Sequence, residues 1–200
     1  MTIFLLIAAS YLLGSIPFGI LLTRAFGAGD LRQIGSGNIG ATNVLRTGRK
    51  SLAAATLVLD GAKGAVAVLL ARHFLPELGD QGAMIAGAAA MIGHCYPVWL
   101  KFRGGKGVAT MLGLSLALAW PIGAIFAFLW IDVVALMRIS SLGGMVGAVS
   151  APIAALALGY PVYAIGLAGL AIVVLWRHRE NIARLRAGTE PRVGRKKDAA

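Results

Sequence analysis

Residues 35–50 combine groups that bind anions with small residues that let a ligand approach the backbone. The segment reads Gly-Ser-Gly-Asn-Ile-Gly-Ala-Thr-Asn-Val-Leu-Arg-Thr-Gly-Arg-Lys and has three cations among its last five residues. Glycine allows close approach of backbone N–H groups to a ligand, and successive exposed N–H groups form a concave anion site. Arg46 could add a planar, two-pronged contact to a phosphate. The segment therefore predicts a site for a phosphorylated substrate.

A second glycine-rich run, Gly104-Gly105-Lys106-Gly107, stands at the start of an expected helix. A helix that begins among glycines presents free N–H groups and the positive end of its dipole to a phosphate, and Lys106 adds a point charge. The Walker A spacing is absent. Alone, this run is equally typical of a flexible turn. Phosphate binding becomes the better interpretation because the first segment is expected on the same membrane face.

His178 and Asn181 are three residues apart near the end of the last apolar run, so they project to one side of a helix. A histidine can accept or position a proton near neutral pH. The alternative is a solvated basic helix end, because Arg177 and Arg184 are close in sequence. Two anion sites and a histidine at a membrane surface indicate group transfer between a phosphate-bearing donor and acceptor, one of them a lipid.

The composition indicates the scaffold that positions these segments. Of 200 residues 58% are hydrophobic and 14% are charged, against roughly 25% charged in soluble domains. We therefore expect one all-α integral membrane domain over residues 1–200. The net charge of +11 is explained by orientation in the membrane and anionic headgroups; no nucleic-acid-binding module is visible, and we expect no nucleic-acid partner. The single cysteine, Cys95, excludes an internal disulfide.

Seven membrane spans are predicted, and Pro121 divides the longest apolar run into two of them. The expected spans are 2–22, 52–71, 82–100, 108–120, 121–137, 142–158 and 162–176. Arg72 is the only lysine or arginine in the loops after even-numbered spans. The positive-inside rule then places the N-terminus outside, the C-terminus in the cytoplasm, and all three polar motifs at the cytoplasmic face. Residues 185–200 are expected to be a flexible, basic, lipid-attracted tail.

Several polar features inside the spans have no single interpretation. Pro17 should kink the first span, either for packing of small residues or to line the site. Asp60 and Lys63 share a helix face and can pair, either as structural groups or at the site. His94 could be structural or a wall of the site, and Asp132 has no expected partner.

The sequence resembles the bacterial acyl-phosphate glycerol-3-phosphate acyltransferases, the PlsY family, over nearly its whole length. The matching motifs are GSIPFG at 14–19, GSGNIGATNVLRTGRK at 35–50, LDGAKG at 59–64, GHCYPVWLKFRGGKGVAT at 93–110 and RHRENIARLRAGTEP at 177–191. The H-x-x-x-x-D motif of other glycerolipid acyltransferases is absent. Together these motifs are specific to the family.

The resemblance implies a seven-helix enzyme of the bacterial plasma (inner) membrane whose active site faces the cytoplasm. It would transfer a fatty acyl group from acyl phosphate to the 1-hydroxyl of sn-glycerol 3-phosphate, giving 1-acylglycerol 3-phosphate (lysophosphatidic acid) and phosphate. Its partners would be these two substrates and the lipid bilayer. No cofactor and no metal is implied, and a monomer would suffice.

The resemblance also assigns roles to individual residues. Ser36, Arg46 and Lys106 would contact phosphate groups, while His178 and Asn181 would hold glycerol 3-phosphate. The rest of the pocket would be made by Asn38, Thr42, Gly104, Gly105 and Gly107. Either His178 or a substrate phosphate would take the hydroxyl proton. Direct transfer is favoured over an acyl-Ser36 intermediate, because no dedicated base stands beside this serine in the sequence.

Two other classes of function compete with this interpretation. Short, glycine-rich helices could form a transporter or flippase for a phosphorylated metabolite, but no internal repeat is found and the motifs lie at one face. A purely structural membrane partner would leave the polar glycine segments unexplained.

Overall fold

A computed structural model describes residues 1–194, and all regular secondary structure in that part of the chain is helical. The α-helices are α1 (Thr2–Gly14), α2 (Phe18–Ala25), α3 (Ala41–Leu45), α4 (Lys50–Phe74), α5 (Gly79–Cys95), α6 (Val108–Leu118), α7 (Trp120–Met137), α8 (Ser140–Ala157), α9 (Pro161–Arg177) and α10 (Arg179–Arg186). The basic residues Arg195, Lys196 and Lys197 of the expected flexible tail lie outside the described residues.

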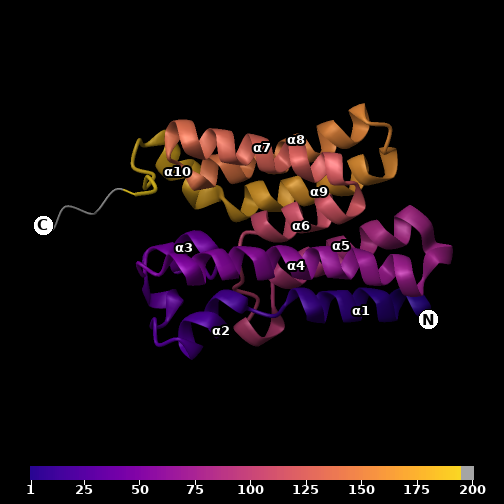
Figure 1. Cartoon of the computed structure of the whole chain (residues 1–200), viewed down its shortest axis with the longest axis horizontal. Coiled ribbons are helices and arrows are strands. Elements are labelled where there is room, and N and C mark those ends of the chain that lie inside the picture. The colour runs from indigo at the N-terminus through magenta and orange to yellow at the C-terminus, as the bar shows by residue number, and fades with distance from the viewer. Residues whose placement is uncertain (195–200) are drawn as a thin grey trace, which may run out of the picture.

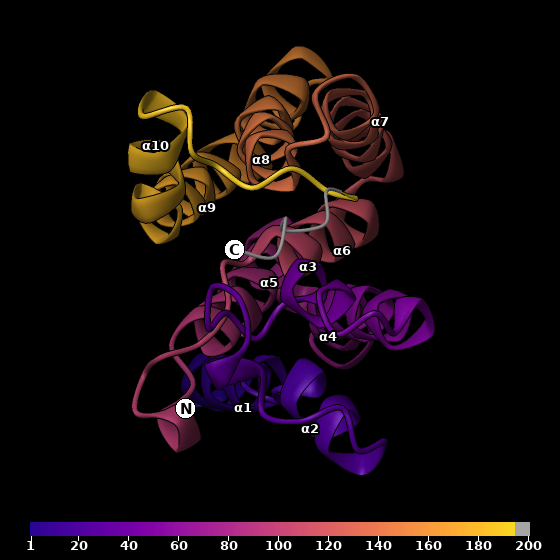
Figure 2. The ribbon, with the colours of Figure 1, turned by 90° about the vertical axis from the view of Figure 1, so that its left-hand side faces the viewer.

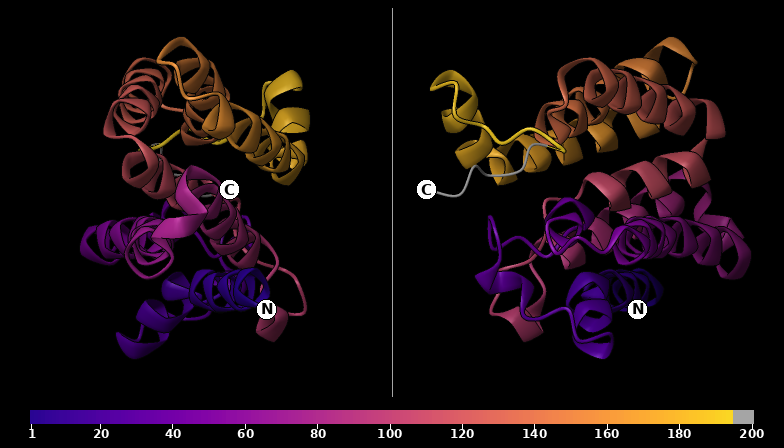
Figure 3. Two further views of the ribbon diagram at one scale, coloured as in Figure 1. Left: turned by 90° about the vertical axis from the view of Figure 1, so that its right-hand side faces the viewer. Right: turned by 60° about the vertical axis from the view of Figure 1, so that its left-hand side comes forward.

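The helices form two groups that lie side by side along the long axis of the molecule (Figure 1). α7, α8 and α9 pack together on one side, α1, α4 and α5 on the other, and α6 contacts both groups. Figures 2 and 3 show the same separation from other directions. Small residues allow the close packing: a Cβ on Gly113 would lie 1.9 Å from the Gly61 carbonyl oxygen. Close approach of backbones at small residues is typical of membrane helices.

Within residues 1–194, five helical segments are long and apolar enough to cross a membrane: Thr2–Ala25, Lys50–Phe74, Pro76–Leu100, Trp120–Met137 and Ser140–Ala157. A sixth is obtained if α9 and α10, bent by 60°, are counted as one span. The remaining apolar helix, α6, has 11 residues, about 16 Å, against a hydrocarbon thickness of about 30 Å. The integral membrane class is therefore supported, while the count of seven spans and the orientation of the termini stay predictions.

The helix interruption predicted at Pro17 is found within the segment Thr2–Ala25, where α1 ends at Gly14 and α2 begins at Phe18. Two carbonyl groups at this break accept hydrogen bonds from other segments: Trp99 Nε1 donates to the Ser15 oxygen at 3.0 Å, and Lys63 Nζ donates to the Ile16 oxygen at 2.8 Å. Backbone groups freed inside a bilayer need such partners. The break is thus supported by side chains from two other parts of the chain.

The division of the long apolar run lies slightly before the predicted position, since α6 ends two residues earlier and α7 begins one residue earlier than expected. α6 ends at Leu118, Ala119 is extended, and Pro121 lies in the first turn of α7. Proline suits a helix start because its missing N–H would be unpaired there. Arg72 donates to the Ala117 and Leu118 carbonyls at the end of α6, at 2.7 and 2.8 Å, so this isolated cation caps a short helix.

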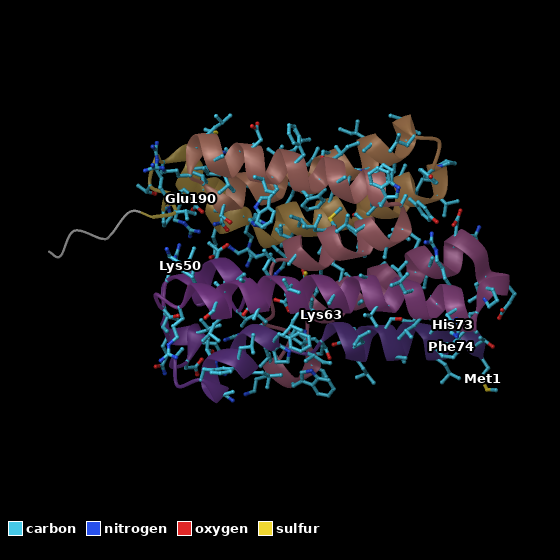
Figure 4. The ribbon with its side chains drawn as sticks, viewed as in Figure 1. Met1, Lys50, Lys63, His73, Phe74 and Glu190 are labelled. Atoms are coloured by element: carbon cyan, nitrogen blue, oxygen red, sulfur yellow. The ribbon has the colours of Figure 1, made fainter. Side chains whose placement is uncertain are left out.

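The three predicted motifs gather at one end of the bundle. Lys50 and Glu190 are found at this end, whereas Met1, His73 and Phe74 lie at the opposite end (Figure 4). α3, α10 and the end of α2 lie at the same end of the long axis (Figure 1). The position of the three motifs at one end agrees with the prediction from the alternation of loops with and without cations.

Candidate active site

The first polar loop is organised by Asn43, whose side chain is buried. Its Nδ2 donates to the carbonyl oxygens of Leu31 and Ile34, both at 2.9 Å, and its Oδ1 accepts from the Ser36 N–H at 3.2 Å. One amide therefore fixes three points of a loop that contains two glycines of positive φ, Gly35 and Gly37. Sequence reasoning missed this residue, because an asparagine among other polar loop residues gives no signal of burial.

The predicted substrate-binding side chains of this loop differ in what they contact. Ser36 and Arg46 are exposed, and a Cβ on Gly35 would lie 2.6 Å from Arg46 Nη1, so the arginine packs over that glycine. Asn38 Oδ1 accepts from the Gly40 N–H at 2.8 Å, which is a local asparagine turn. Ser36, Thr42 and Arg46 are thus the exposed residues of the predicted set, while Asn38 shapes the loop.

Thr42 connects this loop to the other group of helices. Its Oγ1 lies 3.0 Å from Ser140 Oγ at the start of α8. The contact joins residues 98 positions apart in the chain. It places the first loop beside the serine pair Ser140-Ser141.

The Gly104–Gly107 run is held from both sides. The Gly104 and Gly105 N–H groups donate to the Cys95 and His94 carbonyls at 3.1 and 3.0 Å. Arg177 in turn donates to both glycine carbonyls, with Nη2 2.7 Å from the Gly104 oxygen and Nε 3.0 Å from the Gly105 oxygen.

These contacts bear on the donors of the predicted phosphate cradle. The N–H groups of Gly104 and Gly105 donate within the fold, while a contact of these two glycines with the substrate stays a prediction. The N–H groups of Lys106, Gly107 and the first turn of α6 remain as the candidate donors, since the first N–H groups of a helix have no acceptor within it. The two glycines also serve close packing, as described below for Gly105.

Lys106 and Asn181 are brought together by the tertiary structure. The Lys106 ammonium donates to Asn181 Oδ1. Burial, and then the positive charge of Arg184, lower the pKa of Lys106 to about 8. The side chain therefore remains mainly protonated at neutral pH and can neutralise an anionic substrate.

Glu190 orients the other end of the Asn181 amide. Its Oε1 accepts from Asn181 Nδ2 and from Ser141 Oγ, both at 2.6 Å, and its Oε2 accepts from Arg184 Nε at 2.7 Å. Burial acts to raise the pKa of Glu190, but the three donors hold it below its ordinary value. A carboxylate that accepts from Asn181 Nδ2 requires the amide oxygen to face Lys106.

Glu190 was not identified from the sequence as a site residue. It lies in residues 185–194 of the expected flexible tail, where a lone acidic residue among cations gives no signal of a partner. In the structure its side chain is 6% exposed. The neighbouring backbone is attached as well, since the Val193 N–H donates to the Arg138 carbonyl at 2.7 Å.

His178 lies at the junction of α9 and α10 and is 3% exposed. Its Nδ1 is 2.8 Å from the Val174 carbonyl oxygen. Because a carbonyl can only accept, Nδ1 carries the proton and Nε2 has the free lone pair. Burial is the main cause that lowers the pKa of His178 to about 4. The ring is therefore neutral at pH 7 and can accept a hydrogen bond from a substrate hydroxyl.

A line of polar contacts joins the motifs across the two groups of helices. Thr42 contacts Ser140, Ser141 donates to Glu190, and Asn181 links Glu190 to Lys106. The structure thus brings Thr42, Lys106 and Asn181 into one network. Ser36 and Arg46 share this end of the molecule without joining the network. Among residues 1–194 no three His, Cys, Asp or Glu side chains cluster as a metal ion would need.

Comparisons with known proteins agree on a family. A profile described as glycerol-3-phosphate acyltransferase matches residues 4–188. A glycerol-3-phosphate acyltransferase of Ruegeria sp. (strain TM1040) is 63% identical over 186 residues, covering 93% of this chain and 91% of the relative. One of Zymomonas mobilis subsp. mobilis (strain ATCC 31821 / ZM4 / CP4) is 55% identical over 201 residues, covering 95% of each.

Solved structures extend the similarity to the fold. PlsY (YgiH), an integral membrane glycerol 3-phosphate acyltransferase, matches in its glycerol 3-phosphate form with a TM-score of 0.91 and 35% identity, covering 97% of this chain and 96% of that chain. Its lysophosphatidic acid form matches with a TM-score of 0.89 at the same identity and coverage. The helical arrangement described above is therefore that of a membrane acyltransferase.

Proposed function

Because this chain belongs to the glycerol-3-phosphate acyltransferase family, we propose that it moves a fatty acyl group from acyl phosphate to the 1-hydroxyl of sn-glycerol 3-phosphate. The products are 1-acyl-sn-glycerol 3-phosphate and inorganic phosphate, the acyl phosphate being the expected donor from the motif pattern. The observation that carries the proposal is a buried, neutral histidine, His178, beside the Lys106–Asn181 pair.

The reaction needs positioning and charge neutralisation more than covalent help from the protein. An acyl phosphate is a mixed anhydride whose phosphate leaves as a stable anion. The substrate hydroxyl oxygen forms a bond to the acyl carbon, the bond from that carbon to the phosphate oxygen breaks, and the hydroxyl proton is transferred to a base. Holding the reactants together and stabilising the developing charge supply most of the catalysis.

We assign the substrate contacts as follows. Lys106, Arg46 and Ser36 bind phosphate groups, with the N–H groups of Lys106 and Gly107 as further donors. His178 Nε2 accepts from the attacking hydroxyl, and Asn181 helps to hold glycerol 3-phosphate. Asn38, Thr42, Gly104 and Gly105 shape the pocket. With its pKa lowered to about 4, His178 is a weaker base than a phosphate monoester, whose second pKa is about 6, so a phosphate oxygen receives the proton.

The same proposal includes the membrane arrangement. α6 is the additional short pass, giving seven spans with the N-terminus outside and the C-terminus cytoplasmic in a bacterial plasma membrane. Support comes from the grouping of the motif loops at one end (Figure 4) and from Arg72, which caps α6 at the other end. A short pass inside a bundle is tolerated when neighbours satisfy its ends.

The decisive experiment is an assay of the purified protein in detergent with palmitoyl phosphate and glycerol 3-phosphate. Phosphate and 1-acylglycerol 3-phosphate should form in equal amounts, and palmitoyl-CoA should not replace the acyl phosphate. Turnover without a membrane gradient would also separate an enzyme from a transporter. Product formed from palmitoyl-CoA alone would overturn the donor assignment, and acyl-Ser36 trapped after mixing with acyl phosphate alone would overturn direct transfer.

A further inference from the structure

Three ionisable side chains lie together inside the bundle and are not used by the mechanism above. Lys63 Nζ is 2.8 Å from Asp60 Oδ1, and the same oxygen is 3.6 Å from His94 Nδ1. Asp60, Lys63 and His94 are 2%, 3% and 4% exposed. Ionisable groups at membrane depth are costly and usually carry a function. The cluster is therefore a candidate for a role in the site.

One side of the cluster contacts the loop that carries Lys106. The His94 carbonyl accepts from the Gly105 N–H at 3.0 Å. The His94 ring lies directly against the same glycine, since a Cβ on Gly105 would be 2.0 Å from His94 Nε2. His94 thus holds Gly105 by its backbone and by its ring.

The other side of the cluster contacts the break between α1 and α2. Lys63 Nζ donates to the Ile16 carbonyl at 2.8 Å, and the ammonium lies 5.7 Å from the centre of the Phe18 ring. Lys63 is therefore fixed at two points and fixes Asp60, which faces Nδ1 of His94. The ring that supports Gly105 therefore packs against a buried ion pair, with Nδ1 3.6 Å from the Asp60 oxygen and no hydrogen bond between them. Lys63 lies well inside the bundle, away from the end that carries Lys50 and Glu190 (Figure 4).

We propose that His94, packed between the Asp60–Lys63 pair and Gly105, is a positioning residue that sets the place of the Gly104–Gly107 run and so of Lys106. The inference rests on the proposed function, because its readout is the use of glycerol 3-phosphate. A displaced run would move the Lys106 ammonium and the first turn of α6 away from Asn181 and His178. Binding of the anionic substrate would weaken while His178 itself stays in place.

The contact between the His94 ring and Gly105 can be tested by adding a methyl group at the glycine and removing the ring. Gly105→Ala places a methyl group where the His94 ring lies, so the KM for glycerol 3-phosphate should rise about tenfold or more, the scale of losing a hydrogen bond to a charged group. His94→Ala removes the support and should also raise this KM. In the double variant the methyl group occupies the vacated space, so its KM should be lower than that of Gly105→Ala alone.

Gly104→Ala is the matched control. Its Cβ would lie 2.2 Å from the His94 carbonyl oxygen and 2.4 Å from Pro97 Cδ, atoms that His94→Ala leaves in place. Combining His94→Ala with Gly104→Ala should therefore bring no recovery. If the KM for glycerol 3-phosphate recovers when His94→Ala is combined with Gly105→Ala but not with Gly104→Ala, the ring contact is specific. General loosening of the fold would affect both double variants alike.

The outcomes distinguish the inference from the proposed function. If folded wild-type protein does not turn over acyl phosphate and glycerol 3-phosphate, the proposed function is wrong. An active wild type whose His94→Ala variant keeps its KM, or whose two double variants behave alike, would overturn the inference. If His94→Ala does not fold in detergent, His94→Asn replaces it in the three variants that carry it, with thermal unfolding recorded alongside the kinetics and the same results expected.

Discussion

The amide oxygen of Asn181 accepts a hydrogen bond from the Lys106 ammonium, 75 residues earlier in the chain. The contact joins the start of α6 to α10, two segments that sequence reasoning placed at one membrane face without pairing them. Glu190, by accepting from Asn181 Nδ2 at 2.6 Å, determines which way the amide points. A cation, an amide and a carboxylate thus form one ordered unit at the substrate end of the bundle.

Replacing Lys106 should reduce catalysis strongly. Lys106→Ala removes the charge that faces the anionic substrates, and we expect kcat/KM to fall about 100-fold or more, the usual result of losing one preorganised donor. Lys106→Arg keeps the charge and should retain more activity than alanine. Kinetics of both variants with acyl phosphate and glycerol 3-phosphate test this, and equal activity of Lys106→Ala and wild type would contradict the assignment.

The pH dependence should reveal the same lysine. Since the pKa of Lys106 is lowered to about 8, the required charge is present below that pH and is lost as pH rises through it. We therefore expect kcat/KM to decline on the alkaline side near pH 8. In Lys106→Arg this decline should move to higher pH, because arginine stays protonated there. If the alkaline decline of kcat/KM stays at the same pH in Lys106→Arg, it belongs to another ionisable group.

Replacing Glu190 should affect both activity and stability. Glu190→Gln removes the charge that accepts from three donors and lets the Asn181 amide turn away from Lys106, so we expect about a tenfold loss of kcat/KM from one weakened contact. Glu190→Asp, which keeps the charge, is the control. Activity unchanged in Glu190→Gln would show that Asn181 does not depend on this carboxylate.

Glu190 should also contribute a pH-dependent part of the stability. Because folding lowers its pKa, this contribution is complete above the pKa of an exposed glutamate, about 4.3, and is lost as pH falls through the folded value. The difference in unfolding free energy between wild type and Glu190→Gln should therefore shrink in acid. Thermal unfolding in detergent from pH 7 to pH 3.5 measures it, and a difference that grows in acid would refute the assignment.

Arg72 offers a prediction at the opposite end of the bundle. Arg72→Met leaves the Ala117 and Leu118 carbonyls without their donor, which should cost about 2–3 kcal/mol of stability. Both KM values should stay close to wild type because the substrate end is not involved. Thermal unfolding with parallel kinetics tests this, and an unchanged unfolding temperature would show that the cap is dispensable.

His178 should be needed for full turnover. His178→Ala removes the acceptor that orients the substrate hydroxyl, and we expect kcat to fall by about 100-fold, the scale of misplacing a reacting group. His178→Asn, which keeps a small acceptor, should lose less. A wild-type kcat in His178→Ala would leave the orientation of the hydroxyl to the substrates alone.

Local features of the chain were sufficient to predict the helices, the two breaks and the location of the motifs. Proline at 17 and 121 favours a helix interruption because it lacks an N–H and its ring clashes with the preceding turn, whereas Pro152 lies inside α8, which continues past it. The alternation of loops with and without cations predicts a common end for the three motifs, and the structure shows that grouping. These properties depend on residues near one another in sequence.

Contacts between distant segments were decided by the tertiary structure alone. Nothing local to Lys106 shows that it pairs with Asn181, 75 residues away. Nothing local to Ser141 or Gly104 shows that they contact Glu190, 49 residues away, and Arg177, 73 residues away. The physical reason is that a hydrogen bond between distant residues depends on how helices pack, and packing is a property of the whole bundle. The sequence determined which groups could bind a phosphorylated substrate, and the tertiary structure decided which of them remain free to do so.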